Sequence, residues 1–470
     1  MPNFFVSFAL AVLLTGAAVA ADKRPNVIVV VADDMGYGDP SCYGGHAMPT
    51  PHLDALARLG TRYTHFYAAS AVCTPSRAGI LTGRYPIRFG IGRHFKDDGT
   101  HLATSAVTVG TLLKKAGYAT WHVGKWHLGG LRTEDLAAQA AGRPDAAPGP
   151  LQFGFEHTLA TLEGHPRRQL AEEKRFYSDS GKFLVRNGRR ATAEAAHWET
   201  IKINEAIMLM KNKPADGRPF FLYLCFDAPH APYEPAPEPH FAAAKATGAT
   251  GDQLNFRSML AHLDSEIGRL TGYLRSTGQL DNTLLLVTSD NGAAYEGEVG
   301  PFKGGKTDLH EGGLRVPLIA VWPGRVQPGA ISRQRGHHVD LLPSICEAAG
   351  VEFGSLSLDG ISLLPNLTRG VPLEREALFW QIDVYERLQR HYPKPQPIAT
   401  VAVTKGPYKL LLNERHVAVE LFQLENDPGE HRNLLDTHPE KARELAGIAH
   451  RILSEPRANP VKPVDPPRPL

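Results

Sequence analysis

The chain has 470 residues and a formal net charge of +2, and 42% of its residues are hydrophobic and 21% charged. These values are ordinary for a soluble globular protein, and the length suits one large domain plus a smaller one. No long run of Lys or Arg marks a basic surface, so we expect no nucleic-acid partner, although 21 His leave room for a local cationic pocket.

The first twenty residues have the pattern of an export signal. Phe4–Val19 is nearly all apolar, and Ala18-Val19-Ala20 is a small-x-small cleavage site, although no Lys or Arg precedes the apolar stretch. A membrane anchor is the alternative, because the stretch is about long enough to span a bilayer. The cleavage site favours removal of residues 1–20. We therefore expect a secreted or periplasmic protein with no membrane association after cleavage.

Strands and helices alternate along the next 330 or so residues. Asn26–Ala32 is a continuous β-branched run, typical of a strand buried on both faces of a mainly parallel sheet. Further strands are predicted at Tyr63–Tyr67, Ala119–Val123, Phe220–Phe226, Leu284–Val287 and Val316–Val321. Helices are predicted at Pro51–Leu59, from Cys73 onward, and at Val107–Ala116, Phe256–Leu274 and Val339–Ala349. This order predicts an α/β fold with a large mixed, mainly parallel sheet sandwiched by helices.

A second unit is expected after a break near Pro365–Pro372. Its strands are predicted at Thr400–Thr404, Tyr408–Leu412 and Val417–Leu424, and Pro439–Leu453 reads as a closing helix. We expect a catalytic α/β domain over residues 22–370, a C-terminal antiparallel sheet with a helix over 371–455, and a Pro-rich irregular tail over 456–470. The polar stretches Thr133–Pro150 and Arg167–Thr200 are expected to be surface insertions.

The four cysteines are Cys42, Cys73, Cys225 and Cys346. An even number in an oxidising compartment is compatible with two disulfides. However, Cys225 lies in an apolar strand-like run and Cys346 on an apolar helix face, so both resemble small buried hydrophobes. A disulfide framework is therefore the less favoured interpretation.

Two predicted strands end in oxygen-rich side chains. Asp33 and Asp34 follow the first strand, and Asp290 and Asn291 follow Leu284–Val287. Each pair is also acceptable turn chemistry. Carboxyl ends of strands in one α/β sheet converge, however, and adjacent carboxylates repel unless a cation neutralises them. Oxygen ligands favour Ca²⁺, with Mg²⁺ as the second choice, and no Cys/His set has the spacing of a zinc site.

Other strand ends carry basic and imidazole side chains. Lys125 and His127 follow Ala119–Val123, and alternation would place them on the same side. A Lys at the end of a buried strand suggests an anion, whereas a surface Lys or a structural His is the alternative. His230 lies in a Pro-rich loop, and Lys306 in a Gly-rich stretch that is not a P-loop. Taken singly, each of these signals is modest.

The most specific signal is Cys73-Thr-Pro-Ser-Arg77, followed by Leu81-Thr-Gly-Arg84. Pro75 suits a first helical turn, and Arg77 lies one turn on, able to fold back toward position 73. This C-x-P-x-R run resembles the signature of type I sulfatases, in the alkaline phosphatase superfamily. The tail phrase Glu420–Gly429 is also similar to that family, and the arylsulfatase A and N-acetylgalactosamine-6-sulfatase branches are the most alike.

The resemblance implies a sulfuric ester hydrolase that acts on a sulfated carbohydrate or aryl sulfate. A formylglycine-generating enzyme would convert Cys73 to an aldehyde, whose hydrate attacks sulfur and gives a covalent sulfo-enzyme. Calcium would be bound by Asp33, Asp34, Asp290, Asn291 and the modified Cys73. Arg77 would orient the hydrate, Lys125 and Lys306 would bracket the sulfate, His230 with Lys306 would protonate the leaving alcohol, and His127 would deprotonate the second hydroxyl.

Substrate contacts and rival functions stay open at this stage. The candidate substrate residues are Arg93, His94, Lys96, His101 and the loop Glu163–Arg168. One rival is a phosphonate or phosphate ester hydrolase of the same superfamily, and another is an inactive calcium-stabilised glycan-binding homologue with Cys73 unmodified. A thiol hydrolase with a Cys–His pair would leave the paired carboxylates unexplained.

Overall fold

The structure is a computed structural model that describes residues 24–95, 100–143, 146–162, 183–192, 194–213, 216–384 and 399–455. The expected signal peptide, Lys96, Glu163–Arg168 and the tail over 456–470 lie outside these residues. The strands are β1 (Asn26–Ala32), β2 (Thr61–Tyr67), β3 (Ala119–Gly124), β4 (His157–Thr161), β5 (Leu184–Arg186), β6 (Arg189–Arg190), β7 (Phe220–Cys225), β8 (Thr283–Ser289), β9 (Leu318–Val321), β10 (Ala330–His337), β11 (Leu378–Gln381), β12 (Ala399–Lys405), β13 (Tyr408–Asn413) and β14 (Ala418–Gln423).

The α-helices are α1 (Pro51–Leu59), α2 (Cys73–Thr82), α3 (Val109–Lys115), α4 (Thr133–Ala140), α6 (Trp198–Lys211), α7 (His240–Lys245), α8 (Gly251–Ser276), α9 (Glu311–Leu314), α10 (Leu341–Ala349), α11 (Leu364–Arg369) and α13 (Pro439–Ser454). Short 3-10 turns lie at Ser41–Tyr43, Pro86–Phe89, Pro150–Phe153, Leu280–Asn282 and His338–Asp340.

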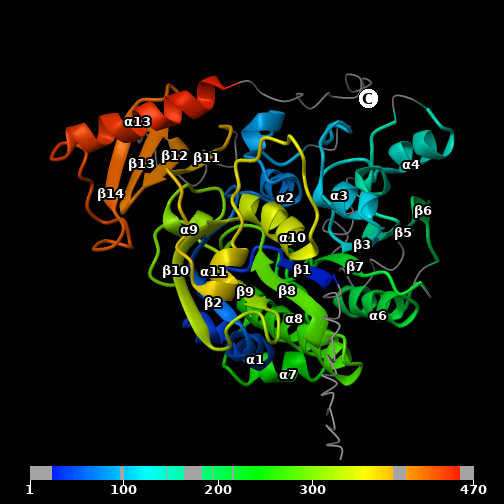
Figure 1. Ribbon diagram of the computed structural model, residues 1–470. Helices are drawn as coiled ribbons and strands as arrows, with labels where there is room; N and C mark the ends of the chain where they lie inside the picture. The colour runs from blue at the N-terminus through cyan, green and yellow to red at the C-terminus, as the bar shows by residue number, and fades with distance from the viewer. Residues whose placement is uncertain are drawn as a thin grey trace, which may run out of the picture.

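A ten-stranded sheet with the order β10-β2-β9-β8-β1-β7-β3-β4-β5-β6 forms the centre of the molecule (Figure 1). β1 pairs in parallel with β7 on one side and with β8 on the other. Helices α2, α3 and α10 cover one face of the sheet, and α1, α6 and α8 cover the other. β1 can therefore be apolar on both faces, as its unbroken β-branched run predicted.

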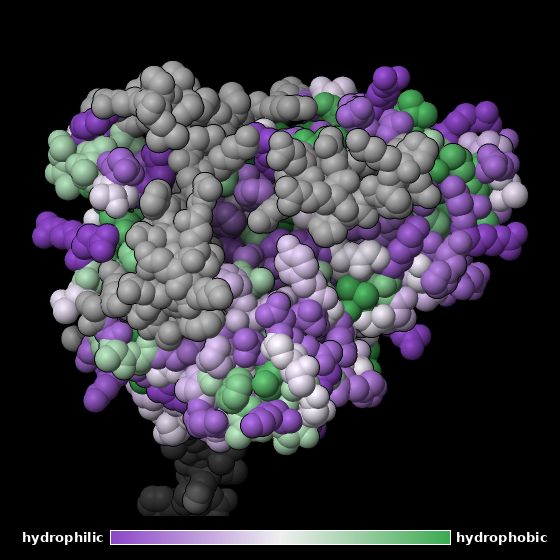
Figure 2. Space-filling model, turned by 180° about the vertical axis from the view of Figure 1, so that it is seen from behind, coloured by the Kyte–Doolittle hydropathy of each residue, from purple (hydrophilic) through white to green (hydrophobic). Residues whose placement is uncertain are grey.

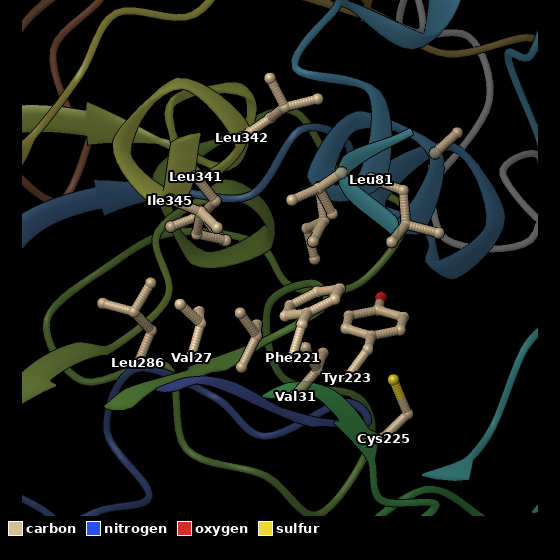
Figure 3. Close-up of a cluster of buried hydrophobic side chains, with 14 of the residues drawn as sticks. Val27, Val31, Leu81, Phe221, Tyr223, Cys225, Leu286, Leu341, Leu342 and Ile345 are labelled. Carbon is tan, nitrogen blue, oxygen red and sulfur yellow. The ribbon is translucent and has the colours of Figure 1, made fainter. Parts of the chain in front are cut away.

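Alternate residues of β1 belong to two different cores. Val27 and Val31 pack with Phe221 and with Leu341 and Ile345 of α10 (Figure 3). Ile28 and Val30 face the opposite way, into the core beneath α8. Because β1, β3, β7 and β8 all run in the same direction, their carboxyl ends lie at one edge of the sheet, where α/β folds bind ligands.

The C-terminal region forms a separate four-stranded antiparallel sheet, β11-β12-β13-β14, and α13 packs against β12 and β13. The predicted antiparallel strands and closing helix are confirmed. The Nε1–H of Trp380 donates to the carbonyl of Ala68 at 2.7 Å and joins this sheet to the segment before α2. We propose that the boundary between the large domain and this C-terminal unit lies after residue 370, a few residues before β11 begins at Leu378.

Several elements differ from the sequence-based expectations. The stretch Thr133–Pro150, expected as an insertion, contains α4, and the described part of Arg167–Thr200 contains β5, β6 and the start of α6. β10 was not predicted, because this edge strand is largely polar and only half-buried before Gly336. Its side chains follow the charged pattern that protects sheet edges rather than the apolar pattern of a core strand.

All four cysteines are free thiols. Within the described ranges, none of the helices combines the length and the apolar character needed to cross a membrane. On the face drawn in Figure 2, hydrophobic side chains are scattered among hydrophilic ones.

Candidate active site

The strand ends and α2 bring eight predicted residues into one buried cluster. Asp33 and Asp34 follow β1, Lys125 follows β3, and Asp290 and Asn291 follow β8. Cys73 and Arg77 come from α2, and Lys306 comes from the Gly-rich loop before α9. The three carboxylates, the amide of Asn291, the thiol and the Arg77 and Lys125 cations are each at most 3% exposed. Such burial requires that the charges be paired.

Helix α2 places Cys73 at its first position, and every residue of the helix is buried. The Sγ atom of Cys73 lies 3.6 Å from Oδ1 of Asp33. Burial, with the negative charge of Asp290, raises the pKa of the Cys73 thiol to about 12. An unmodified Cys73 is therefore a neutral thiol at pH 7 and a weak nucleophile, because the thiolate is the reactive form.

Arg77 bonds to a different partner from the one suggested by its position one turn after Cys73. Its Nε and Nη2 donate to Oδ2 of Asp290 at 3.0 and 2.8 Å, and its Nη1 donates to the carbonyl of Lys125 at 3.1 Å. Nη2 also lies 3.9 Å from Oδ1 of Asp33, the oxygen nearest to the thiol. The carboxylate of Asp33 therefore lies between the Arg77 guanidinium and the Cys73 thiol.

Three cations match three carboxylates at this site. Lys125 pairs with Asp33, Lys306 Nζ lies 2.7 Å from Asp34, and Arg77 pairs with Asp290. Burial alone would raise the pKa of Asp33, but Lys125 and the other nearby cations hold it well below its usual value. Because the six charges sum to zero, a dication and a doubly charged anion can enter together without leaving net buried charge.

The donors near Cys73 suit a hard metal ion. Asp33, Asp34, Cys73 and His230 offer ligand atoms within 4.8 Å of one another. Asn291 donates from Nδ2 to Oδ1 of Asp34 at 2.7 Å, while its buried Oδ1 has no hydrogen-bond partner. Such an orphaned amide oxygen beside two carboxylates is the arrangement that Ca²⁺ or Mg²⁺ uses. The residues therefore fit the expected cation.

The gathered donors differ from the predicted ligand set in two respects. His230 belongs to the group, since its Nε2 lies 3.5 Å from Oδ2 of Asp34. Asp290 lies slightly apart: its Oδ1 accepts the backbone N–H of Asp34 at 3.2 Å, and its Oδ2 accepts from Arg77. Burial and the neighbouring charge of Asp33 raise the pKa of Asp290 to about 6.

The two predicted acid–base histidines occupy different surroundings. His230 directs Nδ1 at the carbonyl of Ala231, which assigns the proton to Nδ1. Burial and the Lys306 ammonium lower the pKa of His230 to about 4. His127 is half-buried, and its carbonyl accepts from Thr74 Oγ1 at 2.9 Å, which ties it to the first turn of α2.

Backbone strain concentrates around the cluster. Asp34, His127 and Thr307 have φ values of 65°, 60° and 75°. Left-handed backbone is unfavourable for residues other than glycine, at a cost of about 1–3 kcal/mol each, and it persists only where the surroundings impose it. Each of these residues is, or adjoins, a predicted site residue, so the strain marks the same place as the chemistry.

The structure describes part of the predicted substrate region. Arg93, His94 and His101 are half-buried. The backbone N–H of Phe95 donates to Thr74 Oγ1 at 3.3 Å, so this segment passes over the start of α2. His101 packs against Gly129, two residues after His127. His101 and the segment that ends at Phe95 therefore adjoin the elements that carry the site.

Sequence reasoning missed the buried support behind His230. Glu199 of α6 accepts the backbone N–H groups of Asp227 and Ala228 at 3.1 and 2.8 Å. Lys202 Nζ bonds to Glu199 at 2.8 Å and to Asp227 at 2.7 Å. The carbonyl of Ala228 in turn accepts the N–H of Asp33 at 3.1 Å. Only the W-E-T-I-K spacing, with Glu199 and Lys202 one turn apart, could have signalled this network.

Comparisons with known proteins agree with this geometry. Residues 25–351 match the sulfatase family profile, and residues 297–455 match the C-terminal region of N-sulphoglucosamine sulphohydrolase. N-acetylgalactosamine-6-sulfatase of Sus scrofa is 34% identical over 389 residues, covering 77% of this chain and 69% of the relative. Arylsulfatase A of Bos taurus is 31% identical over 473 residues, covering 92% and 87%. The solved PsFucS1 sulfatase from Pseudoalteromonas sp. superposes with a TM-score of 0.73 at 26% identity, covering 93% and 92%.

Proposed function

Because this chain belongs to the sulfatase family, we propose that it is a calcium-dependent enzyme that releases sulfate from a sulfated carbohydrate after conversion of Cys73 to formylglycine. The observation that carries this proposal is the position of Cys73. It lies at the first residue of a buried helix, 3.6 Å from a carboxylate that is also paired with Lys125. A family relative is named N-acetylgalactosamine-6-sulfatase, which supports a sulfated sugar as substrate.

Asp33, Asp34, Asp290, Asn291 and residue 73 would hold Ca²⁺, with Mg²⁺ as the second choice, and His230 lies beside them. A dication bound there would polarise the sulfate oxygens and lower the pKa of the hydrated aldehyde. The Lys125 and Lys306 ammonium groups would bracket the sulfate and stabilise the charge that builds up as the ester bond breaks. Fixed charges of this kind often contribute more to the rate than any other feature of an active site.

The proposed reaction has two steps. One hydroxyl of the residue 73 hydrate gives up its proton to solvent, and its oxygen forms a bond to sulfur as the S–O bond to the sugar breaks. The leaving alcohol takes its proton from the Lys306 ammonium, which shares the Asp34 carboxylate with His230. His127 then removes the proton of the second hydroxyl, and that oxygen becomes the carbonyl of residue 73. The bond between the carbon and the sulfated oxygen breaks, so sulfate leaves with the oxygen that attacked sulfur. Addition of water to the aldehyde restores the hydrate, so the net reaction is hydrolysis of the sulfate ester.

The direct test is mass spectrometry of the peptide that contains position 73, combined with turnover on a chromogenic aryl sulfate. We expect active protein to carry the aldehyde, which is lighter than the thiol. We expect Cys73→Ser to stop turnover or to accumulate a sulfated serine, because a serine has no second hydroxyl to expel sulfate. Undiminished multiple turnover by Cys73→Ser would overturn the proposal.

The same preparation separates the rival functions. Rates on aryl sulfate and aryl phosphate, measured side by side, distinguish a sulfatase from a phosphonate or phosphate ester hydrolase. Protein that binds sulfated sugars with an intact Cys73 thiol and no turnover would be the glycan-binding homologue. An extracytoplasmic location belongs to the proposal as well, and cleavage after Ala20 in exported protein is its test.

A further inference from the structure

The segment Glu420–Gly429 has no role in the proposed chemistry. It begins in the C-terminal sheet, which contacts the loop that carries Lys306. Lys303 Nζ lies 3.4 Å from Oε1 of Glu420, a residue of β14. His310 Nε2 lies 2.9 Å from the other oxygen of the same carboxylate. Lys306 therefore sits midway along a segment whose two ends both contact one side chain of the C-terminal sheet.

A second, fully buried network anchors Glu311, the residue after His310. The backbone N–H of Glu311 donates to Oε2 of Glu430 at 2.6 Å. Lys409 of β13 lies 3.1 Å from Glu311 and 3.0 Å from Glu430, and Arg315 Nε donates to Glu311 at 2.8 Å. Two cations and two carboxylates therefore balance, and each is at most 3% exposed. Removing one charge would leave its partner buried and unpaired.

The loop between these anchors is strained and tightly folded. Thr307, next to Lys306, is β-branched and has a φ of 75°. A side chain at Gly313 would collide with the carbonyl of Asp308, since a Cβ there would lie 2.0 Å from that oxygen. The loop itself bonds to the site: Lys306 N donates to Ala293 O at 2.7 Å, and Thr307 N to Ala71 O at 2.8 Å. Strained backbone persists only where its surroundings hold it.

We propose that Glu420, Lys409 and Glu430 are positioning residues for Lys306, so that the C-terminal sheet helps to build the catalytic centre. This inference rests on the proposed role of Lys306 at the leaving group. Lys306 meets Asp34 through a 2.7 Å contact, and small displacements of a catalytic group cost large factors in rate. Loosening the anchors would move the ammonium while leaving the remaining site residues in place.

The experiment measures kcat and KM on a chromogenic aryl sulfate for Glu420→Gln and Glu430→Gln, each in the wild-type and in a Lys306→Ala background. The matched control is Glu376→Gln, which breaks the exposed Glu376–Arg451 pair of the same C-terminal unit, 2.6 Å long. All assays run below the thermal midpoint of each variant, with folding checked by circular dichroism.

We expect kcat to fall about fivefold for Glu420→Gln and about tenfold or more for Glu430→Gln, with KM changed less than about twofold. Glu376→Gln should match the wild type. In the Lys306→Ala background the two substitutions should cost less than about twofold more, because residues that act through one group are not additive. Full multiplication of the losses in that background, or unchanged kcat in folded Glu420→Gln and Glu430→Gln, would overturn the inference.

Three further results also have a defined meaning. If Glu430→Gln does not fold, Glu420→Gln decides the matter, because that carboxylate is 28% exposed and the buried His310 keeps its second partner, Asp308. If Lys306→Ala itself keeps wild-type kcat, the proposed role of Lys306 fails together with this inference. If Lys306→Ala is impaired but the losses multiply, only the inference fails.

Discussion

Arg77 gives two hydrogen bonds to a single oxygen of Asp290, at 3.0 Å from Nε and 2.8 Å from Nη2, and neither side chain is exposed. This pair joins the helix that carries Cys73 to the end of β8. It fixes the distance between Cys73, the proposed nucleophile position, and Asn291, which directly follows Asp290. The guanidinium also bonds to the Lys125 carbonyl, so one side chain links three of the elements that form the site.

Arg77→Lys should impair catalysis more than its preserved charge suggests. An ammonium cannot reproduce the planar donors that contact Asp290 and the Lys125 carbonyl together. We expect kcat to fall by about 10²-fold and the free energy of unfolding to fall by about 2–4 kcal/mol, since the buried carboxylate loses part of its pairing. Aryl sulfate kinetics and urea unfolding measure both, and a fully stable, fully active Arg77→Lys protein would contradict this account.

Lys125→Ala should lower kcat by on the order of 10²-fold or more, as removal of one preorganised donor does elsewhere. The ammonium is buried and pairs with Asp33, beside the thiol position. Lys211→Ala, a substitution at the exposed end of α6, is the matched control. Equal kcat values for the two variants would rule out a charge-stabilising role for Lys125.

Calcium should raise the thermal midpoint of the protein, because a ligand that binds only the folded state stabilises it. We expect Asn291→Leu, which removes the unpaired amide oxygen and keeps similar volume, to abolish this rise. Measured by differential scanning fluorimetry with chelator and with added Ca²⁺ or Mg²⁺, the shift also identifies the ion. A calcium-dependent rise that survives in Asn291→Leu would remove Asn291 from the ligand set.

The ion pairs of His310 with Asp308 and Glu420 should weaken at alkaline pH. Burial opposes its charge, but bonds to Asp308 and Glu420 raise the pKa of His310 to about 9, above the unfolded value of 6.5. Because the pKa of His310 is higher in the folded than in the unfolded protein, its full contribution to the free energy of unfolding is present below pH 6.5. That contribution disappears as the pH rises through 9. Between pH 6 and 10 the wild type should lose of the order of 2–3 kcal/mol more unfolding free energy than His310→Asn. Parallel pH profiles of the two proteins in urea unfolding would contradict this assignment.

Two glycines should respond oppositely to alanine. A Cβ at Gly292, directly after Asn291, would lie 2.0 Å from the carbonyl oxygen of Gly312, so Gly292→Ala must separate the Asp290–Asn291 loop, the proposed metal-ligand loop, from the segment that follows Lys306. Gly272 is exposed on α8 with nothing within 4 Å of an added Cβ. Gly272→Ala should raise the free energy of unfolding by about 0.5–1 kcal/mol, while Gly292→Ala lowers both stability and kcat. Loss of stability in both variants would show that the α8 backbone does not tolerate a side chain.

Much of the site could be predicted because its residues follow buried parallel strands. The β-branched run of β1 and the apolar runs of β7 and β8 locate the strand ends, and parallel strands bring those ends together. Position after a strand indicated Asp33 and Asp290 as candidate ligands. Lys125 and His230 were only modest signals by position, and the family resemblance assigned them to the site. The C-x-P-x-R run added Cys73, which sequence periodicity alone could not have singled out.

Side-chain direction could not be predicted in the same way. Alternation of Lys125 and His127 stops being a guide once β3 ends, because Gly124 and His127 both have positive φ values. The target of Arg77 depends on where β8 ends relative to α2, which is a tertiary relationship. The Lys202–Asp227 pair and the Lys409–Glu311 pair join residues tens to about a hundred positions apart, so no local pattern reports these contacts, and only the Glu199–Lys202 pair is local.

The complete burial of α2 means that Cys73 must be modified before the protein finishes folding. Only 3% of Cys73 is exposed, and its neighbours in the helix are covered by β8, α3, α10 and the turn His338–Asp340. Under the proposed chemistry, the maturing enzyme must reach this sulfur while the chain is still open. A molecule that folds before Cys73 is oxidised keeps its thiol, so the relative rates of oxidation and folding decide the active fraction of a preparation.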